Sequence, residues 1–394
     1  MTADHSDLVG RARAILADLV AFDTTSEKSN LGLIDYVADL LSESGISHRR
    51  VHDETQRKAN LFATVGPNVA GGIVLSGHTD VVPVEDQAWT SDPFTLTERR
   101  GRFFGRGTCD MKGFLALALA AVPDMVRANP SVPIHLAFSY DEEIGCIGVR
   151  PMIDAIIRDL PRPRAVIVGE PTSMKVVNAH KGSRRFVTRV TGYAAHSSQS
   201  HKGANAIAAA AKLIGFLEDE QAKRTASAPP PESTRFTPPY TTIEVGTIDG
   251  GTAANIIPRS CRFEWEYRML PDESPETIIE AFRAYAEDHV LPPLQERHAD
   301  CAIDTKELAF APPFRTNPES DAESLAFMLA GTNETEAVSF ATEAGLFEAA
   351  DIPTVVCGPG HITEAHKPDE FIDRGQLEAG AAFMARLIAL VEAR

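Results

Sequence analysis

The sequence predicts an α/β protein with a mixed central sheet, helices on both of its faces, and a smaller α+β domain inserted into it. Near-continuous apolar segments, typical of strands buried on both faces, alternate with helical segments up to Glu170 and again from about Pro312. Between these two parts the predicted strands alternate apolar and polar residues, which is typical of half-exposed strands. We therefore expect one discontinuous domain, residues 1–181 and 312–394, interrupted by a second domain over residues 182–311.

The larger predicted domain starts with a helix capped by Ser6, whose apolar residues recur at helical spacing as far as Val20. The further helices expected in this domain are Leu31–Leu41, Lys112–Ala128, Val149–Asp159, Ala322–Leu329 and a last one ending near Arg394. Its expected strands are Asn60–Val65, Ile73–Ser76, Ile134–Ser139, Ala165–Val168 and Thr354–Cys357. Strands that alternate with helices in this way indicate a sheet covered on both faces.

The inserted domain is predicted to follow the order β-α-β-β-α-β of a small two-layer fold. Its expected strands and helices are Arg185–Thr191, Ala204–Glu218, Thr242–Ile248, Cys261–Met269 and Pro275–His289. The proline-rich segment 228–240 interrupts this order as a loop, and no function follows from its sequence.

Composition excludes several classes of function. A soluble globular protein is indicated by 394 residues that are 43% hydrophobic and 24% charged. The net charge of −17 argues against a nucleic-acid or anionic-membrane partner. The N-terminal segment lacks a signal-peptide pattern, and the five cysteines are scattered without a CxxC pair. We expect a cytoplasmic protein without a disulfide framework.

Ionisable side chains follow the predicted strands of the larger domain at the point where each strand ends. In open α/β sheets this edge is where ligands bind. Histidines and carboxylates that converge there suit Zn²⁺ or a similar divalent ion with mixed nitrogen and oxygen ligands. The residues are His78, Asp80, Asp110, Glu142, Glu143, Glu170 and His366.

Each of these residues alone has an ordinary structural explanation. A single histidine is usually structural, the acidic triplet at residues 141–143 is usually a solvated turn, and Asp110 is placed to cap the helix that follows it. The recurrence of such residues at successive strand ends favours metal binding. Asp141 receives no role, and we expect it to be the solvated member of the triplet.

Seven motifs in fixed order resemble a known family between about residues 70 and 375. They are "GHTDVVP", "GRGTCDMKG", "SYDEE", "GEPT", "AHSS", "GGTAANIIP" and "AHKPDE". The chain is similar to the di-zinc amidohydrolases and metallopeptidases that include acetylornithine deacetylase, succinyl-diaminopimelate desuccinylase, aminoacylase and carboxypeptidase G-type enzymes. Among these, "GPGHITEAHKPDEF" and "EPTSMKVVNAHKG" most resemble the acetylornithine deacetylase branch. The resemblance implies a zinc-exopeptidase-like catalytic domain and a ferredoxin-like inserted domain for dimerisation or for a lid.

The resemblance also implies roles for the residues of the larger domain. Asp110 would bridge two Zn²⁺ ions, with Co²⁺ as an alternative metal. His78 and Glu170 would complete one site, and Glu143 and His366 the other. Asp80 would hold the far nitrogen of His78, and Glu142 would be the general base.

In the inserted domain, the same resemblance implies that His196 stabilises the oxyanion, in many relatives from the partner subunit of a homodimer. Asn255 and Arg268 would bind the α-carboxylate of the substrate. Lys181 and Glu343 are further candidates for substrate contacts, and Glu343 has the alternative role of stabilising a helix start.

The implied reaction is hydrolysis of N2-acetyl-L-ornithine to L-ornithine and acetate, a step of arginine biosynthesis. The alternatives within the same class are a succinyl-diaminopimelate desuccinylase and a broader N-acyl-amino-acid deacylase. An alternative from another class is a catalytically silent protein that binds metal or an amino acid. A silent protein of this kind is expected to have lost the general base or a metal ligand, whereas this sequence has a suitable residue at every such position.

Overall fold

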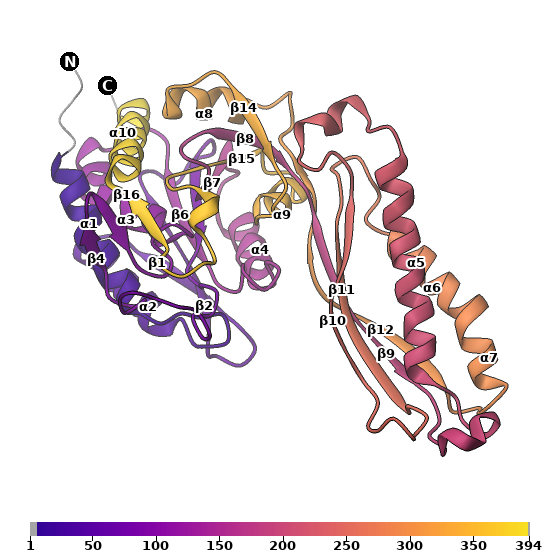
Figure 1. Ribbon diagram of the computed structural model, residues 1–394. Coiled ribbons are helices and arrows are strands. Elements are labelled where there is room, and N and C mark those ends of the chain that lie inside the picture. The colour runs from indigo at the N-terminus through magenta and orange to yellow at the C-terminus, as the bar shows by residue number, and fades with distance from the viewer. Residues whose placement is uncertain (1–5, 393–394) are drawn as a thin grey trace. The chain divides into compact units, whose positions relative to one another are not determined.

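In a computed structural model of the chain, residues 6–392 are described and divide into two compact units (Figure 1). The larger unit consists of the chain up to Ala179, the segment Phe314–Ala337, and the chain from Thr342 on. The smaller unit consists of His180–Pro313 together with Val338–Ala341. Each unit has its own hydrophobic core.

The larger unit is built on a nine-stranded mixed sheet, which confirms the predicted fold class. The strand order is β1-β2-β6-β3-β7-β15-β8-β13, and β14 pairs with β8. The four neighbours β6, β3, β7 and β15 run parallel, whereas β1, β2 and β8 join antiparallel. The bounds in sheet order are β1 His48–His52, β2 Ala59–Val65, β6 Ile134–Ser139, β3 Ile73–His78, β7 Ala165–Pro171, β15 Thr354–Gly358, β8 Val176–His180, β13 Phe314–Arg315 and β14 Thr335–Val338.

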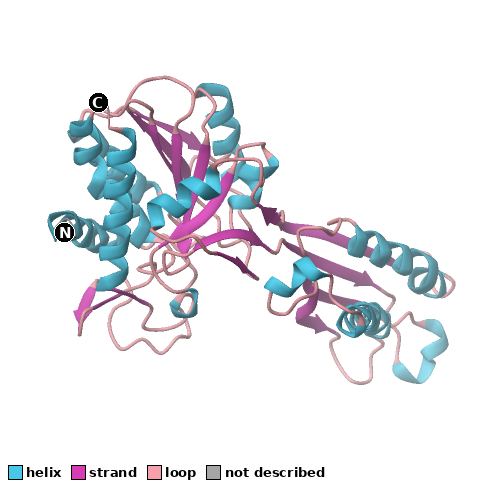
Figure 2. Ribbon diagram, turned by 90° about the horizontal axis from the view of Figure 1, so that it is seen from above, coloured by secondary structure: helices cyan, strands magenta, loops and turns pink. Residues whose placement is uncertain are grey.

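Helices lie on both faces of this sheet (Figure 2). One face carries α3 with α1, α10 and α8 around it, and the other carries α4 and α9. The bounds are α1 Ser6–Ala21, α2 Leu31–Glu43, α3 Lys112–Ala128, α4 Val149–Asp159, α8 Ala322–Ala330, α9 Ala344–Ala349 and α10 Arg374–Val391. A separate three-stranded sheet contains β16 Phe371–Asp373, β5 Arg102–Phe104 and β4 Thr97–Arg99.

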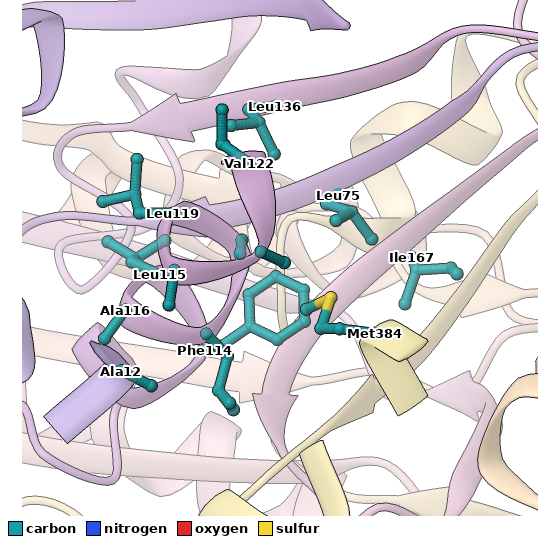
Figure 3. Packing of buried hydrophobic residues seen from close by; sticks show 14 of the residues in the cluster. Ala12, Leu75, Phe114, Leu115, Ala116, Leu119, Val122, Leu136, Ile167 and Met384 are labelled. Atoms are coloured by element: carbon teal, nitrogen blue, oxygen red, sulfur yellow. The ribbon is translucent and has the colours of Figure 1, made fainter. Parts of the chain in front are cut away.

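The core of the larger unit explains why α3 is apolar on every side. Figure 3 shows Phe114 of α3 in one cluster with Leu75 and Ile167 of the sheet and Met384 of α10. Because α3 lies between the sheet and two helices, every residue from Lys112 to Val122 is buried, whereas its last turns are partly exposed. Among residues 6–392, no helix is both long and apolar enough to cross a bilayer.

The smaller unit is a four-stranded antiparallel sheet, order β10-β11-β9-β12, with its helices packed on one face. The bounds are β10 Thr242–Gly250, β11 Ser260–Arg268, β9 Ser183–Thr191, β12 Ala302–Ala311, α5 Ala206–Ala226, α6 Thr277–Tyr285 and α7 Leu291–Gln295. The core includes Phe186, which stacks on Trp265 with ring centroids 4.7 Å apart. A buried aromatic sheet face covered by helices is the two-layer α+β arrangement expected for this segment.

The order β-α-β-β-α-β predicted for the inserted domain is confirmed, since β9, α5, β10, β11, α6 and β12 follow in this order along the chain. No bounds were predicted for β12, and β1 and β8 of the central sheet were missed. β1 reads His-Arg-Arg-Val-His, and more than half of β12 is exposed or partly exposed, so neither shows a clear apolar alternation. The predicted helix Pro275–His289 is shorter, because α6 ends at Tyr285 and a π-helical turn, Ala286–Val290, follows. α10 ends at Val391, and the predicted end near Arg394 lies outside the described residues.

One glycine tests how closely α3 packs on the sheet. Gly169, in β7, lies directly against the ring of Phe114, and a Cβ at this position would overlap that ring. We expect Gly169→Ala to lower the free energy of unfolding by about 1–3 kcal/mol, since the core has to shift to accept the methyl group. Urea denaturation followed by far-UV circular dichroism measures the change.

The matched control is Gly10→Ala, in the exposed interior of α1, where a Cβ would meet nothing within 4 Å. This change should raise stability by about 0.5–1 kcal/mol, because alanine loses less backbone entropy on folding. Equal effects of the two substitutions would contradict the packing of Phe114 on Gly169.

Candidate metal centre

The ionisable residues predicted from the strand ends gather at one edge of the central sheet. β3 ends at His78, Glu170 lies at the end of β7, and Glu142 and Glu143 follow β6. Because β6, β3 and β7 run parallel, their carboxyl ends meet at the same edge. Asp110, immediately before α3, joins them there.

The first group of ligand-type side chains contains His78, Asp110 and Glu170, all buried. Nε2 of His78 lies 3.0 Å from Oδ1 of Asp110 and 3.7 Å from Oε1 of Glu170. One ligand atom from each residue falls within 4.8 Å of the others. Such a spacing matches three donors around a common ion.

The second group contains Asp110, Glu143 and His366, again within 4.8 Å of one another. Nε2 of His366 lies 3.2 Å from Oδ2 of Asp110 and 3.0 Å from Oε2 of Glu143. Asp110 therefore directs one carboxylate oxygen to each histidine. This is the arrangement that a carboxylate bridging two ions requires.

The orientation of His78 is set by the chain that follows it. Its Nδ1 lies 2.8 Å from the backbone carbonyl oxygen of Asp80. Because a carbonyl oxygen only accepts, Nδ1 carries the proton and Nε2 is left to face Asp110 and Glu170. His78 thus presents the nitrogen that a metal ligand needs.

The carboxylate of Asp80 does not make the expected hydrogen bond to His78. It lies 3.6 Å from Nδ1 of His78, beyond hydrogen-bond distance. Instead it accepts the hydroxyl of Ser26 at 2.7 Å and the backbone N–H groups of Glu142 and Glu143 at 3.1 and 3.3 Å. The backbone of Asp80 orients His78, and its side chain holds the turn that carries the two glutamates.

Burial and mutual repulsion shift the pKa values of these carboxyl groups. Burial raises the pKa of Glu142 to about 8, against the favourable charge of His78. Burial and the neighbouring Asp110 raise the pKa of Glu143 to about 7. The pKa of Glu170 is also raised well above its usual range by burial and by Asp110. Negative charge is therefore costly here unless a cation accompanies it.

The histidines carry the compensating charge. Burial disfavours charged His78, yet the hydrogen bond to Asp110 and the charge of Glu170 outweigh it and raise its pKa well above the usual value. Hydrogen bonds to Asp110 and Glu143 raise the pKa of His366 to about 11. Asp110, between two histidines, has a lowered pKa despite its burial.

These residues fit a pair of divalent cations. Imidazole nitrogens and carboxylate oxygens are the donors found at zinc and cobalt sites. Oε1 of Glu143 is buried and has no hydrogen-bond partner among residues 6–392, which leaves it free for an ion. A bound ion would also replace the protons that now balance the carboxylates.

Glu142 lies beside both groups and belongs to neither. Its side chain is buried, and Oε1 accepts the thiol of Cys146 at 3.2 Å. The adjacent residue Asp141 was expected to be solvated, and this prediction was wrong. Asp141 is buried, has φ of 56°, and pairs with Nζ of Lys58 at 2.5 Å, a partner 83 residues away that the local sequence does not indicate.

Glu343 is buried, and its carboxylate contacts two serines and not the start of a helix. Its Oε1 accepts the hydroxyl of Ser76 at 2.6 Å, and Oε2 accepts that of Ser139 at 2.7 Å. Glu343 directly precedes α9, but its side chain makes no capping hydrogen bond with that helix, so the predicted role at a helix start is not supported. Both carboxylate oxygens are thus engaged beneath the site by the ends of β3 and β6.

The remaining predicted residues belong to the smaller unit, where His196 lies near Asn255 and Lys181 lies near Arg268. His196 is exposed and next to Asn255, whose carbonyl oxygen accepts the N–H of Ser197 at 2.9 Å. Lys181 is buried and donates to the carbonyl oxygen of Tyr240 at 2.6 Å. Arg268 neighbours Lys181 and pairs with Glu266 at 3.0 Å.

Three residues around the centre were not predicted: Lys58, Arg106 and Glu370. Arg106 and Glu370 form a buried ion pair at 2.8 Å, with both side chains 1% exposed. For Arg106 and Glu370, the feature of the sequence that could have indicated a role is their position inside the motifs "GRGTCDMKG" and "AHKPDE", which also contain Asp110 and His366.

Comparison with known proteins agrees with this geometry. Residues 74–390 match the sequence profile of peptidase family M20/M25/M40. The chain is 36% identical to an acetylornithine deacetylase of Myxococcus xanthus, covering 98% of each chain, and 34% identical to one of Proteus mirabilis, covering 93% of this chain and 92% of the relative. Similar solved structures include an M20 family metallo-carboxypeptidase of Sulfolobus solfataricus, with a TM-score of 0.75, 19% identity and coverage of 97% and 99%. Human carnosine dipeptidase 1 has a TM-score of 0.72 at 16% identity, with coverage of 98% and 99%.

The raised pKa values predict how stability depends on pH in the metal-free protein. The folded state binds more protons than the unfolded chain at His78, Glu142, Glu143 and His366. Stability from these groups is therefore greatest at acidic pH and falls as pH rises through their raised pKa values. We expect the Tm in EDTA to fall between about pH 5.5 and 8.5, while the gain from added Zn²⁺ grows because fewer protons compete.

Differential scanning fluorimetry at several pH values, with EDTA and with Zn²⁺, measures both quantities. The control is Glu143→Gln, which removes one of the titrating carboxyl groups and should reduce the pH dependence of the zinc effect. A stabilisation by Zn²⁺ that stays constant across this pH range would contradict the assignment.

Proposed function

This chain belongs to peptidase family M20/M25/M40, and from that membership we propose that it hydrolyses the amide bond of an N-acyl amino acid, namely N2-acetyl-L-ornithine. The products would be L-ornithine and acetate, as in arginine biosynthesis. Support for this substrate comes from acetylornithine deacetylases that are 34–36% identical over nearly the whole chain. We expect the enzyme in the cytoplasm, in line with its scattered cysteines, which are all free and buried.

The observation that carries the proposal is the pair of ligand groups that share Asp110. We propose that His78 and Glu170 complete the site of one divalent ion, and Glu143 and His366 that of the other. Zn²⁺ is the proposed metal, with Co²⁺ as a substitute. When bound, such ions polarise the scissile carbonyl and make water a stronger nucleophile at neutral pH.

Glu142 is proposed as the general base. It is buried next to both groups without belonging to either, so its carboxylate is available to move a proton. Burial raises the pKa of Glu142 in the metal-free chain. A divalent ion bound beside it would favour the ionised carboxylate, the form that can accept a proton. Glu142 would take the proton of the attacking water and deliver it to the leaving amine. Asp80 holds the backbone N–H of Glu142 and so orients it.

For the smaller unit, the proposal rests on its sequence motifs. His196 would donate a hydrogen bond to the oxyanion, and Asn255 and Arg268 would bind the α-carboxylate of the substrate. Lys181 is proposed as a further substrate contact. We also propose that the enzyme is a homodimer formed through this unit.

The role of Glu142 predicts a variant that separates catalysis from metal binding. Glu142→Gln keeps the size of the side chain but cannot accept a proton, so kcat should fall by about 10²–10⁴. Metal content should stay near that of the wild type, because Glu142 is not in either ligand group. Steady-state kinetics with metal analysis of the same samples measures both.

The control is Glu348→Gln, a half-buried carboxylate of the same unit that binds the backbone N–H groups of Asn317 and Thr354. Its kcat should match that of the wild type. Near-normal turnover by a metal-loaded Glu142→Gln protein would remove Glu142 from the mechanism.

The substrate is tested by comparing kcat/KM for N2-acetyl-L-ornithine, N-succinyl-L,L-diaminopimelate and N-acetyl-L-methionine, with EDTA, Zn²⁺ or Co²⁺. We expect the highest value for acetylornithine and loss of activity in EDTA. A preference for the succinyl substrate would indicate a desuccinylase, and one for acetylmethionine a broader deacylase. A protein that binds metal and hydrolyses none of them would be the catalytically silent homologue.

A further inference from the structure

Glu370, just before β16, concentrates four hydrogen-bond donors on one buried carboxylate. Its Oε1 accepts the backbone N–H groups of Cys109 at 2.8 Å and of Asp110 at 3.0 Å. Its Oε2 accepts the N–H of Gly107 at 2.9 Å and Nη1 of Arg106 at 2.8 Å. The side chain of Glu370 is 1% exposed, so N–H groups of the loop 106–110 replace the water molecules that would otherwise solvate its charge.

Arg106 extends the same contacts to other segments. Its Nη1 also donates to the carbonyl oxygen of Lys367 at 3.3 Å. Its Nη2 donates to the carbonyl oxygen of Pro83 at 3.3 Å and to Oε1 of Gln87 at 2.6 Å. The guanidinium lies 5.0 Å from the ring centre of Trp89. Three segments of the larger unit, 83–89, 106–110 and 367–370, thus meet on one buried ion pair.

These segments are the ones that carry or adjoin the candidate ligands outside the sheet. The loop 106–110 ends at Asp110, the residue shared by both ligand groups. Glu370 follows His366 by four residues, and the carbonyl oxygen of Glu370 accepts the N–H of Gly105 at 3.0 Å. Neither His366 nor Asp110 lies in a strand, so hydrogen bonds of a ladder do not fix their backbones.

We propose that Glu370 is a positioning residue for the metal centre. It orients the two carboxylate oxygens of Asp110, and through its pair with Arg106 it holds the segments of Asp110 and His366 in a fixed position relative to each other. This inference rests on the proposed di-metal function and adds a residue that touches neither metal nor substrate. Loss of the Glu370 charge would leave the amides of Cys109 and Asp110 and the guanidinium of Arg106 with poorer partners. The loop would then relax, and a shift of Asp110 would affect both ions together.

Titration of Zn²⁺ into metal-free Glu370→Gln, with a competing chelator, tests the proposal. We expect about 10–100-fold weaker zinc binding than in the wild type, the usual effect of removing a group that orients a ligand. The weakening should apply to both ions. The visible spectrum of the Co²⁺-loaded variant should also change, because it reports ligand geometry.

Glu348→Gln is the matched control, since Glu348 likewise accepts two backbone N–H groups in the larger unit but lies away from the ligands. It should lose stability in the metal-free state without loss of zinc affinity. Arg106→Lys is the second variant and keeps a positive charge for Glu370 while losing the planar fork. It should bind zinc more weakly than the wild type and more tightly than Glu370→Gln.

Wild-type zinc affinity in Glu370→Gln, or an equal loss in Glu348→Gln, would overturn the inference. If Glu370→Gln does not yield folded protein, wild-type affinity in Arg106→Lys would overturn it as well. The substrate proposal fails separately. A wild-type protein that binds two zinc ions but does not hydrolyse acetylornithine, with weakened binding in Glu370→Gln, would refute that substrate and support the role of Glu370.

Discussion

The structure depends on one electrostatic constraint: several carboxylates are buried together at the end of a parallel sheet. Asp110, Glu142, Glu143 and Glu170 lie too close to all be ionised without positive charge among them, and burial makes each charge more costly. In the metal-free chain the positive charge comes from protonated His78 and His366. The raised pKa values of the carboxyl groups reduce the negative charge, because they favour the protonated form. Of these four carboxylates, Asp110 is the one that contacts both histidines, and it therefore lies at the centre of the group.

The carboxylates just outside this centre follow the opposite rule, since each has its own fixed partner. Asp141 pairs with Lys58, Glu370 with Arg106, and Glu343 accepts two serine hydroxyls. Buried charges need such partners, and the cost of leaving one alone is several kcal/mol. The contrast separates two kinds of carboxylate at the same sheet edge. Some are satisfied by the protein, and others are left for an external cation, such as Glu143, whose Oε1 has no hydrogen-bond partner in the described part of the chain.

This contrast also explains which parts of the fold and of the site could be predicted from the sequence. The parallel strands and the residues at their ends were predictable, because burial on both faces leaves a plain apolar pattern and the strand ends share one edge. β1 lacks that pattern and was missed, and the last strand of the inserted domain, β12, was expected from the order of the fold without bounds. Asp141 was misjudged because the partner that decides its burial, Lys58, comes from a segment distant in the chain. Partner choice depends on tertiary contacts, which residue types alone do not encode.

The two ligand groups are therefore held by different means. His78 and Glu170 extend from adjacent parallel strands, and the backbone of Asp80 fixes the proton of His78. His366, at a φ of 62°, lies outside the sheet and is half exposed, whereas the side chain of His78 is 1% exposed. A regular ladder gives the first group its precision. The second group lacks a ladder, so its geometry has to come from side chains that bind loop backbone, and the buried pair of Arg106 and Glu370 is placed to provide it.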